Sequence, residues 1–121
     1  MKILKVMLMI SGLMFAVSGF GQSSHSVALT WVASSDAASN PTLTYAVYRA
    51  SVACPASGSP TGLTKLVAVS ATTYTDTAVS VGQTYCYIVR ASLNGSESVD
   101  SNTAGGTIPI APVTGLSITV K

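Results

Sequence analysis

Apolar and polar residues alternate from Ser26 onward with the period of two that is typical of β-strands. The alternation is clearest in Thr84–Ser92, where every second residue is aromatic or aliphatic: Tyr85, Tyr87, Val89 and Ala91. We place this set on the inward face of a strand and Cys86, Ile88 and Arg90 on the outward face. The chain contains no convincing helical period, so the predicted fold class is all-β.

Turn residues divide the remainder of the chain into further short strands. The predicted strands are Ser26–Val32, Leu43–Arg49, Lys65–Val69, Thr72–Thr75, Thr84–Ser92 and a return strand within Ser96–Thr107. The pair Asn94-Gly95 can adopt the left-handed backbone angles of a tight hairpin, so the return strand should lie beside the strand before it. Six strands at this spacing predict a β-sandwich or a barrel.

Residues 1–21 have the composition of a secretory signal peptide. Lys2 and Lys5 form a cationic head, and a mainly apolar run follows over 6–17. Small residues come next, with cleavage expected after Gly19 or Gly21. The alternative is an uncleaved membrane anchor, but such a run rises only about 20 Å as a helix, short of the roughly 30 Å hydrocarbon core. We therefore predict a secreted product, extracellular or periplasmic, that is free of the membrane after cleavage.

The charge of the chain belongs to this leader. The formal net charge of the whole chain is +2, and removal of Lys2 and Lys5 leaves four cations and four acids. A neutral surface without clustered Lys and Arg predicts no nucleic-acid partner. One histidine, scattered carboxylates and no G-x-S-x-G elbow predict no enzyme activity, no cofactor and no metal site.

Four segments carry a family resemblance. They are LTW at 29–31, YAVYR at 45–49, YTDT at 74–77 and GQTYCYIVRA at 82–91. In order, spacing and chemistry they resemble a fibronectin type III domain of the bacterial extracellular kind, over roughly Ser26–Pro109. The resemblance implies an immunoglobulin-like β-sandwich of about six to seven short antiparallel strands, with 22–109 as the domain. It also implies that the hydroxyl of Tyr85 bonds to upstream backbone as a tyrosine corner.

The resemblance also suggests roles for particular side chains. The expected core positions are Trp31, Tyr45, Val47, Tyr74, Tyr85, Tyr87 and Val89. Tyr48 and Arg90 share the outward face of adjacent strands, and an exposed Tyr with Arg is typical of a contact surface for a protein or a polysaccharide. The alternative is ordinary cross-strand packing on a sheet face.

The two cysteines are expected to pair. In the family fold, the loop that holds Cys54 lies beside the start of the strand that holds Cys86, and export places both in an oxidising compartment. A redox or zinc pair is the alternative. Their spacing is not C-x-x-C, and zinc would need two further ligands that the single His25 cannot supply. His25 itself is expected to be solvated in the frayed start of the mature chain.

The chain departs from the family pattern at its first strand. Family members begin with a strand that precedes the tryptophan strand, whereas here only Gln22–His25 stand between the leader and that strand. A strand-like segment lies instead within 110–121, where apolar residues alternate with polar ones: Leu116, Ile118 and Val120. We interpret 110–121 as a linker, the stub of a following domain or a strand that folds back on its own sandwich.

Two functions follow as hypotheses. The first is a secreted, non-catalytic module for extracellular binding, adhesion or spacing, because bacterial members of the family usually accompany adhesins, surface proteins or polysaccharide-degrading enzymes. Its partner would be a protein or polysaccharide at the cell surface. The alternative is a structural subunit that forms homo-oligomers head to tail, by donating strand 113–120 to the missing first strand of a neighbour.

Overall fold

The computed structural model describes residues 6–13 and 24–121, and every regular element in these ranges is a β-strand. The strands are β1 (Val6–Leu13), β2 (Ser24–Trp31), β3 (Thr44–Ala50), β4 (Thr64–Val69), β5 (Thr73–Asp76), β6 (Thr84–Leu93), β7 (Ser96–Glu97) and β8 (Ala104–Thr107). Among the described residues, no helix is long and apolar enough to cross a membrane.

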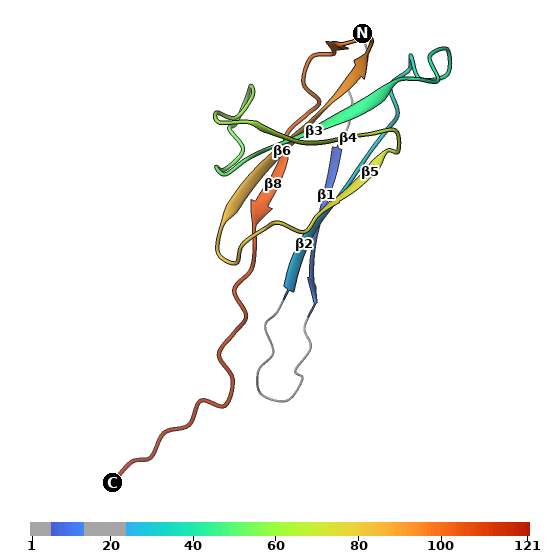
Figure 1. The fold of residues 1–121 in the computed structure, drawn as a ribbon. Coiled ribbons are helices and arrows are strands. Elements are labelled where there is room, and N and C mark those ends of the chain that lie inside the picture. The colour runs from blue at the N-terminus through green and yellow to red at the C-terminus, as the bar shows by residue number, and fades with distance from the viewer. Residues whose placement is uncertain (1–5, 14–23) are drawn as a thin grey trace.

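The strands form two antiparallel sheets of a sandwich (Figure 1). One sheet has the order β1-β2-β5. The other has the order β4-β3-β6, and both β7 and β8 pair with different parts of β6. The predicted all-β sandwich is confirmed, and residues 6–13 and 24–121 contain eight strands in place of the predicted six or seven. The predicted return strand is split in two, because residues 98–103 leave the ladder between β7 and β8.

The core lies between the two sheets and follows the alternation of the sequence. Side chains from β2, β3 and β6 are buried there together with Val6 and Ile108. Trp31 and Tyr45 meet edge to face with ring centroids 5.7 Å apart, a favourable aromatic geometry. Most of the expected core positions are buried, namely Trp31, Tyr45, Val47, Tyr85, Tyr87 and Val89. Tyr74 is only partly buried and packs at the margin of this cluster.

The crossover from β5 to β6 is fastened by Tyr85. The backbone N–H of Ser80 donates a hydrogen bond to the Tyr85 hydroxyl at 3.0 Å, which is the tyrosine corner that the resemblance implied. Gly82 completes this turn with a φ of 77°, in the left-handed region that favours glycine. Its N–H also donates to the carbonyl of Ile108, so the turn holds the end of β8.

A buried carboxylate links the two sheets beside this crossover. Asp76, at the end of β5, is 1% exposed. One of its oxygens accepts from the backbone N–H of Ala78, two residues along the chain, at 3.0 Å. Its other oxygen accepts from Arg49 Nη1 at 2.8 Å and from the Tyr87 hydroxyl at 2.7 Å. Asp76 therefore ties β5 of one sheet to β3 and β6 of the other, a role that the sequence did not indicate.

The place of the family's first strand is occupied, contrary to the expectation from the sequence. The strand β1 runs antiparallel to β2, with Val6 opposite Trp31 and Leu13 opposite Ser24. These residues belong to the apolar run that resembles an export signal. The expected cleavage sites after Gly19 and Gly21 lie outside the described residues. His25 was expected in a frayed start, but it lies within β2.

The predicted strand at 113–120 is not formed in the described structure. Residues 108–121 have no regular structure, and the chain extends away from the sandwich at the end where β8 finishes (Figure 1). The apolar side chains of Val113, Leu116, Ile118 and Val120 are 82–91% exposed. A strand needs a neighbour for its backbone groups, and this segment has none within the described chain.

Replacement of the buried carboxylate should weaken the sandwich substantially. In Asp76→Asn the charge that pairs with Arg49 is lost, and we expect the free energy of unfolding to fall by about 2–4 kcal/mol, because a largely buried cation loses its partner. Urea denaturation would measure the change. The matched control is Asp36→Asn, since Asp36 is exposed in a polar loop, and it should stay within about 0.5 kcal/mol of the parent. Equal stability of the two variants would contradict this role of Asp76.

Candidate binding face

The pairing of β3 with β6 brings the two predicted face residues together. Tyr48 lies opposite Ile88, and Ala46 lies opposite Arg90, so Tyr48 and Arg90 are diagonal neighbours on the outer face of the five-stranded sheet. The guanidinium carbon of Arg90 stands 4.5 Å from the centre of the Tyr48 ring, a cation–π distance. One face of the tyrosine ring is therefore already covered by this arginine.

Three further charged residues complete what we call the outer-face cluster: Tyr48, Lys65, Arg90, Glu97 and Asp100. The Tyr48 hydroxyl donates to the Glu97 carboxylate, with oxygen distances of 2.7 and 2.9 Å. Glu97 also meets Arg90 Nη1 at 3.3 Å and Lys65 Nζ at 3.7 Å. Asp100 accepts from Arg90 Nε at 2.6 Å. Two cations and two carboxylates thus balance each other on this face.

The sequence pattern did not indicate the acidic half of this cluster. In the sequence, Glu97 and Asp100 are two of the scattered carboxylates. The Asn94-Gly95 turn could have indicated the position of Glu97. Pairing the residues on either side of this turn places Glu97 opposite Ser92, which is two residues from Arg90. Asp100 could not be found in this way, since it follows the point where the chain leaves the ladder.

Part of the outer face is buried beneath a loop, which corrects the expected exposure of β6. Cys86 and Ile88 have the outward parity predicted for them, yet both are 0% exposed. The Cys54–Cys86 disulfide, with a Cα separation of 5.0 Å, confirms the predicted pairing and holds loop 51–62 against β6. Parity correctly assigned these residues to a face, but it could not indicate that a loop covers this face.

Close packing beside the disulfide also constrains β8. A Cβ atom at Gly105 would collide with the carbonyl oxygen of Tyr85 and would stand 2.7 Å from Cys54 Sγ. Only glycine fits there, because β8 pairs with β6 at the level of the disulfide. Loop, disulfide and β8 thus form one packed unit on this side of the sheet.

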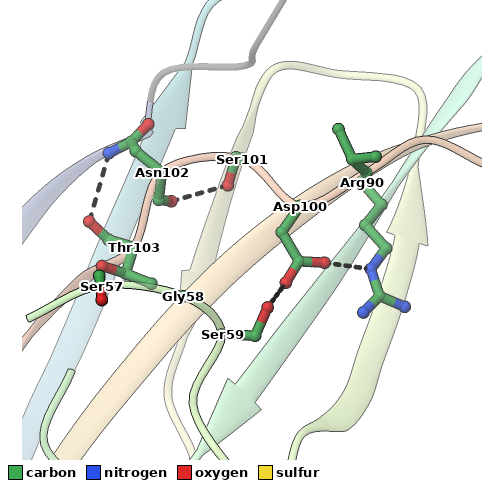
Figure 2. A pocket seen from close by; sticks show the side chains of 9 residues that line it. Ser57, Gly58, Ser59, Arg90, Asp100, Ser101, Asn102 and Thr103 are labelled. Atoms are coloured by element: carbon green, nitrogen blue, oxygen red, sulfur yellow. Dashed lines mark hydrogen bonds and ion pairs between the residues drawn. The ribbon is translucent and has the colours of Figure 1, made fainter. Parts of the chain in front are cut away.

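A polar hollow lies where the loop meets the segment between β7 and β8 (Figure 2). Its volume is about 700 Å³, and it is lined by Ser57, Gly58, Ser59, Arg90, Val99, Asp100, Ser101, Asn102 and Thr103. The Ser59 hydroxyl donates to Asp100, which closes the far end of the loop onto the outer-face cluster. Hydroxyl and amide groups at its rim can both donate and accept hydrogen bonds, as a hydroxyl-rich or peptide ligand requires. Among the described residues, no three His, Cys, Asp or Glu side chains are placed to hold a metal ion.

Hydrogen bonding perturbs the titration of this cluster. The hydrogen bond from Tyr48 lowers the pKa of Glu97, and Arg90 and Lys65 lower it further. The same bond raises the pKa of Tyr48. For Asp100, burial acts to raise the pKa, but hydrogen bonds from Ser59 and Arg90 outweigh it and the pKa lies below its ordinary value. Both carboxylates are therefore held in their charged form by their partners.

The two sheets, the tyrosine corner and the strand order define a fibronectin type III sandwich, and solved structures agree. A fibronectin type III domain from the human KIAA0970 protein is 21% identical with a TM-score of 0.57, covering 81% of this chain and 77% of that one. A Fn3-like protein from Clostridium thermocellum is 28% identical with a TM-score of 0.51, covering 86% and 92%.

A third similar structure is a much longer enzyme. Pectate lyase PelI from Erwinia chrysanthemi is 23% identical with a TM-score of 0.53, and the match covers 84% of this chain but only 28% of that one. No protein-family model matches the chain, and no curated protein matches it. The chain has the fibronectin type III fold that its sequence resembles, and this likeness establishes the fold alone.

The stability of the domain should fall in acid through this cluster. Glu97 and Asp100 have depressed pKa values in the folded state. Their contribution to the free energy of unfolding is therefore fully present above the pKa values of the unfolded chain, about 4, and is lost as the pH falls through the pKa values of the folded state. Urea denaturation between about pH 5 and pH 2 should register this decline.

The double variant Glu97→Gln/Asp100→Asn lacks both titrating groups and should show a shallower decline over the same range. Asp36→Asn, which leaves both groups in place, serves as the control and should follow the parent curve. An unchanged acid slope in the double variant would contradict the coupling of these carboxylates to folding.

Proposed function

We propose that this chain is an exported, non-catalytic fibronectin type III module that acts outside the cytoplasm by contact or spacing. The observation that carries the proposal is the Cys54–Cys86 disulfide, because structural disulfides form and persist in oxidising compartments. The export-like composition of residues 1–21 supports the same setting independently.

The contact surface that we favour is the outer-face cluster together with the polar hollow beside it. Loop 51–62 is fastened at Cys54 by the disulfide and at Ser59 by the bond to Asp100, so the rim of the hollow is held in place before any ligand arrives. Preorganisation of this kind reduces the entropy lost on binding. Serine and threonine side chains line the hollow, and their hydroxyl groups can hydrogen-bond to the hydroxyl groups of a polysaccharide.

Polysaccharide is also the ligand class that one of the similar structures supports. Pectate lyase PelI is described in complex with tetragalacturonic acid. Galacturonan and neutral polysaccharides are therefore the first ligands to test for binding to this chain, and cell-surface proteins are the second class. A ligand with regularly spaced carboxylates would compete with Glu97 and Asp100 for Arg90.

Export is the first expectation to check. Expressed with its own leader in a bacterium, the chain should be recovered from the periplasm or the medium, with a mature N-terminus at Phe20 or Gln22 and no free thiol. N-terminal sequencing, intact mass and thiol titration measure these outcomes. Leu8→Arg, which interrupts the apolar run, is the control and should stay in the cytoplasm. A parent protein retained in the cytoplasm with reduced cysteines would overturn the proposal.

Ligand contact is the second expectation. Binding of the mature protein to immobilised galacturonan and neutral polysaccharides should weaken at least about tenfold in Arg90→Ala, because this substitution removes the cation shared by Tyr48, Glu97 and Asp100. The matched control Lys121→Ala removes an exposed cation far from the hollow. Equal binding by both variants would exclude this face, and binding to none of the panel would leave spacing as the function.

A further inference from the structure

We propose that in the exported protein the place of β1 is taken by residues 116–120 of a second copy, the part of the predicted strand 113–120 that carries Leu116, Ile118 and Val120, so that copies join head to tail. The inference rests on the proposed function, because cleavage after Gly19 or Gly21 would remove Val6–Leu13 together with the leader. It goes beyond that function by naming the partner as this chain itself.

Loss of β1 would open an edge of the three-stranded sheet. The register pairs Val6 with Trp31, Leu8 with Leu29 and Ile10 with Val27. The three β2 residues in these pairs are 1–6% exposed and belong to the core. Without β1, the edge of β2 would present unpaired backbone groups beside apolar side chains, a strong template for strand addition.

The C-terminal segment matches the vacated positions in residue type and spacing. In β1 the residues opposite the core positions are Val, Leu and Ile at 6, 8 and 10. In the segment the same three types recur with the same spacing, at Leu116, Ile118 and Val120. Its intervening residues, Ser117 and Thr119, are polar, as the outer side of an edge strand requires.

The direction of the chain also fits addition to a second copy. β1 and β8 run toward the end of the sandwich where β2 begins, and the C-terminal segment continues outward from there (Figure 1). A segment that continues in this direction meets the opposite end of the next copy and runs beside its β2 antiparallel, as β1 does. The contact is heterologous and does not close on itself, so it generates a linear assembly.

A side chain that binds backbone stands at the start of the vacated strand. The N–H of Val6 donates to Asn102 Oδ1 at 2.7 Å, and Asn102 Nδ2 donates to the Val6 carbonyl at 3.2 Å. On the side of residue 6, both bonds involve only main-chain groups. The Asn102 side chain can therefore bind any residue at this position. In the proposed register that residue is Leu116 of the second copy, opposite Trp31.

The connecting segment sets how far apart two joined copies can lie. Ile108 is fixed by hydrogen bonds to Gly82 and Gln83, and residues 109–115 can span about 23 Å when extended. Insertion into its own sandwich would require the segment to turn back and run the length of β2 before pairing antiparallel. If it paired directly from where it leaves β8, it would run parallel to β2 instead.

Assembly of the exported protein tests this proposal. We expect the mature product to sediment as a concentration-dependent series of oligomers and to form linear particles in electron microscopy. Ile118→Asp places a charge at a position opposite Leu29 and should yield monomers, whereas Thr119→Asp places the same charge on the outer side and should still assemble. Both residues are exposed within the isolated chain, so neither substitution threatens folding.

Cross-linking distinguishes a second copy from the same chain. The register places Thr119 opposite Ala28 of the acceptor. Mature Ala28→Cys mixed with mature Thr119→Cys should therefore form a covalent dimer under mild oxidation, while Ile118→Cys in place of Thr119→Cys should not.

Any of the following three results would overturn the inference that a second copy replaces β1. A parent that stays monomeric at all concentrations excludes it while leaving export and ligand contact intact. An Ala28→Cys/Thr119→Cys double variant that cross-links only within one chain shows self-insertion instead. An exported product that retains residues 6–13 overturns the inference because β1 then keeps its place, and the signal-peptide prediction is wrong as well.

Discussion

Both faces of β6 are buried, and the rest of the sandwich is arranged to cover them. Residues from Tyr85 to Val89 are at most 5% exposed, although a strand of an antiparallel sheet often has one face in water. The three-stranded sheet covers the inner face. On the outer face, loop 51–62 is attached by the disulfide at Cys86 and by the bond from Ser59 to Asp100. Closing a loop of 32 residues contributes about 3–4 kcal/mol in the chain-entropy account, a large share for a domain of this size.

The outer-face cluster begins where this cover ends. Arg90 is the next outward residue of β6 after the buried Ile88, and its side chain remains 28% exposed. Its charge is matched by carboxylates from the chain that returns across the hairpin, and Ser59 of the loop binds one of them. The loop that buries one end of the face therefore also fixes the polar groups at the other end. Stability and the proposed contact surface depend on the same segment.

The sequence predicted the strands well and their long-range partners poorly, for a physical reason. Alternation depends only on neighbours in the chain, so the predicted bounds of the strand at 84–92 differ from β6 by one residue. The Arg49–Asp76 pair joins residues 27 positions apart in different sheets, and no local pattern indicates it. Within the candidate site, the alternation of side chains along a strand predicts that Tyr48 and Arg90 share a face. The position of Asp100 depends instead on where residues 98–103 leave the pairing with β6 and on the contact with Ser59 of loop 51–62.

The sequence did not predict β1 for a different reason: the same apolar run has the composition of both an export signal and an edge strand. An export signal and an edge strand both need a short apolar segment flanked by polar or small residues, and Val6–Leu13 can serve as either. The two uses exclude each other in time, since the proposed cleavage would remove the strand. A sandwich that lost its first strand in this way would need a replacement, and Leu116, Ile118 and Val120 repeat the spacing of Val6, Leu8 and Ile10 with side chains that are exposed to water. Export and assembly would then be coupled through a single vacant strand position.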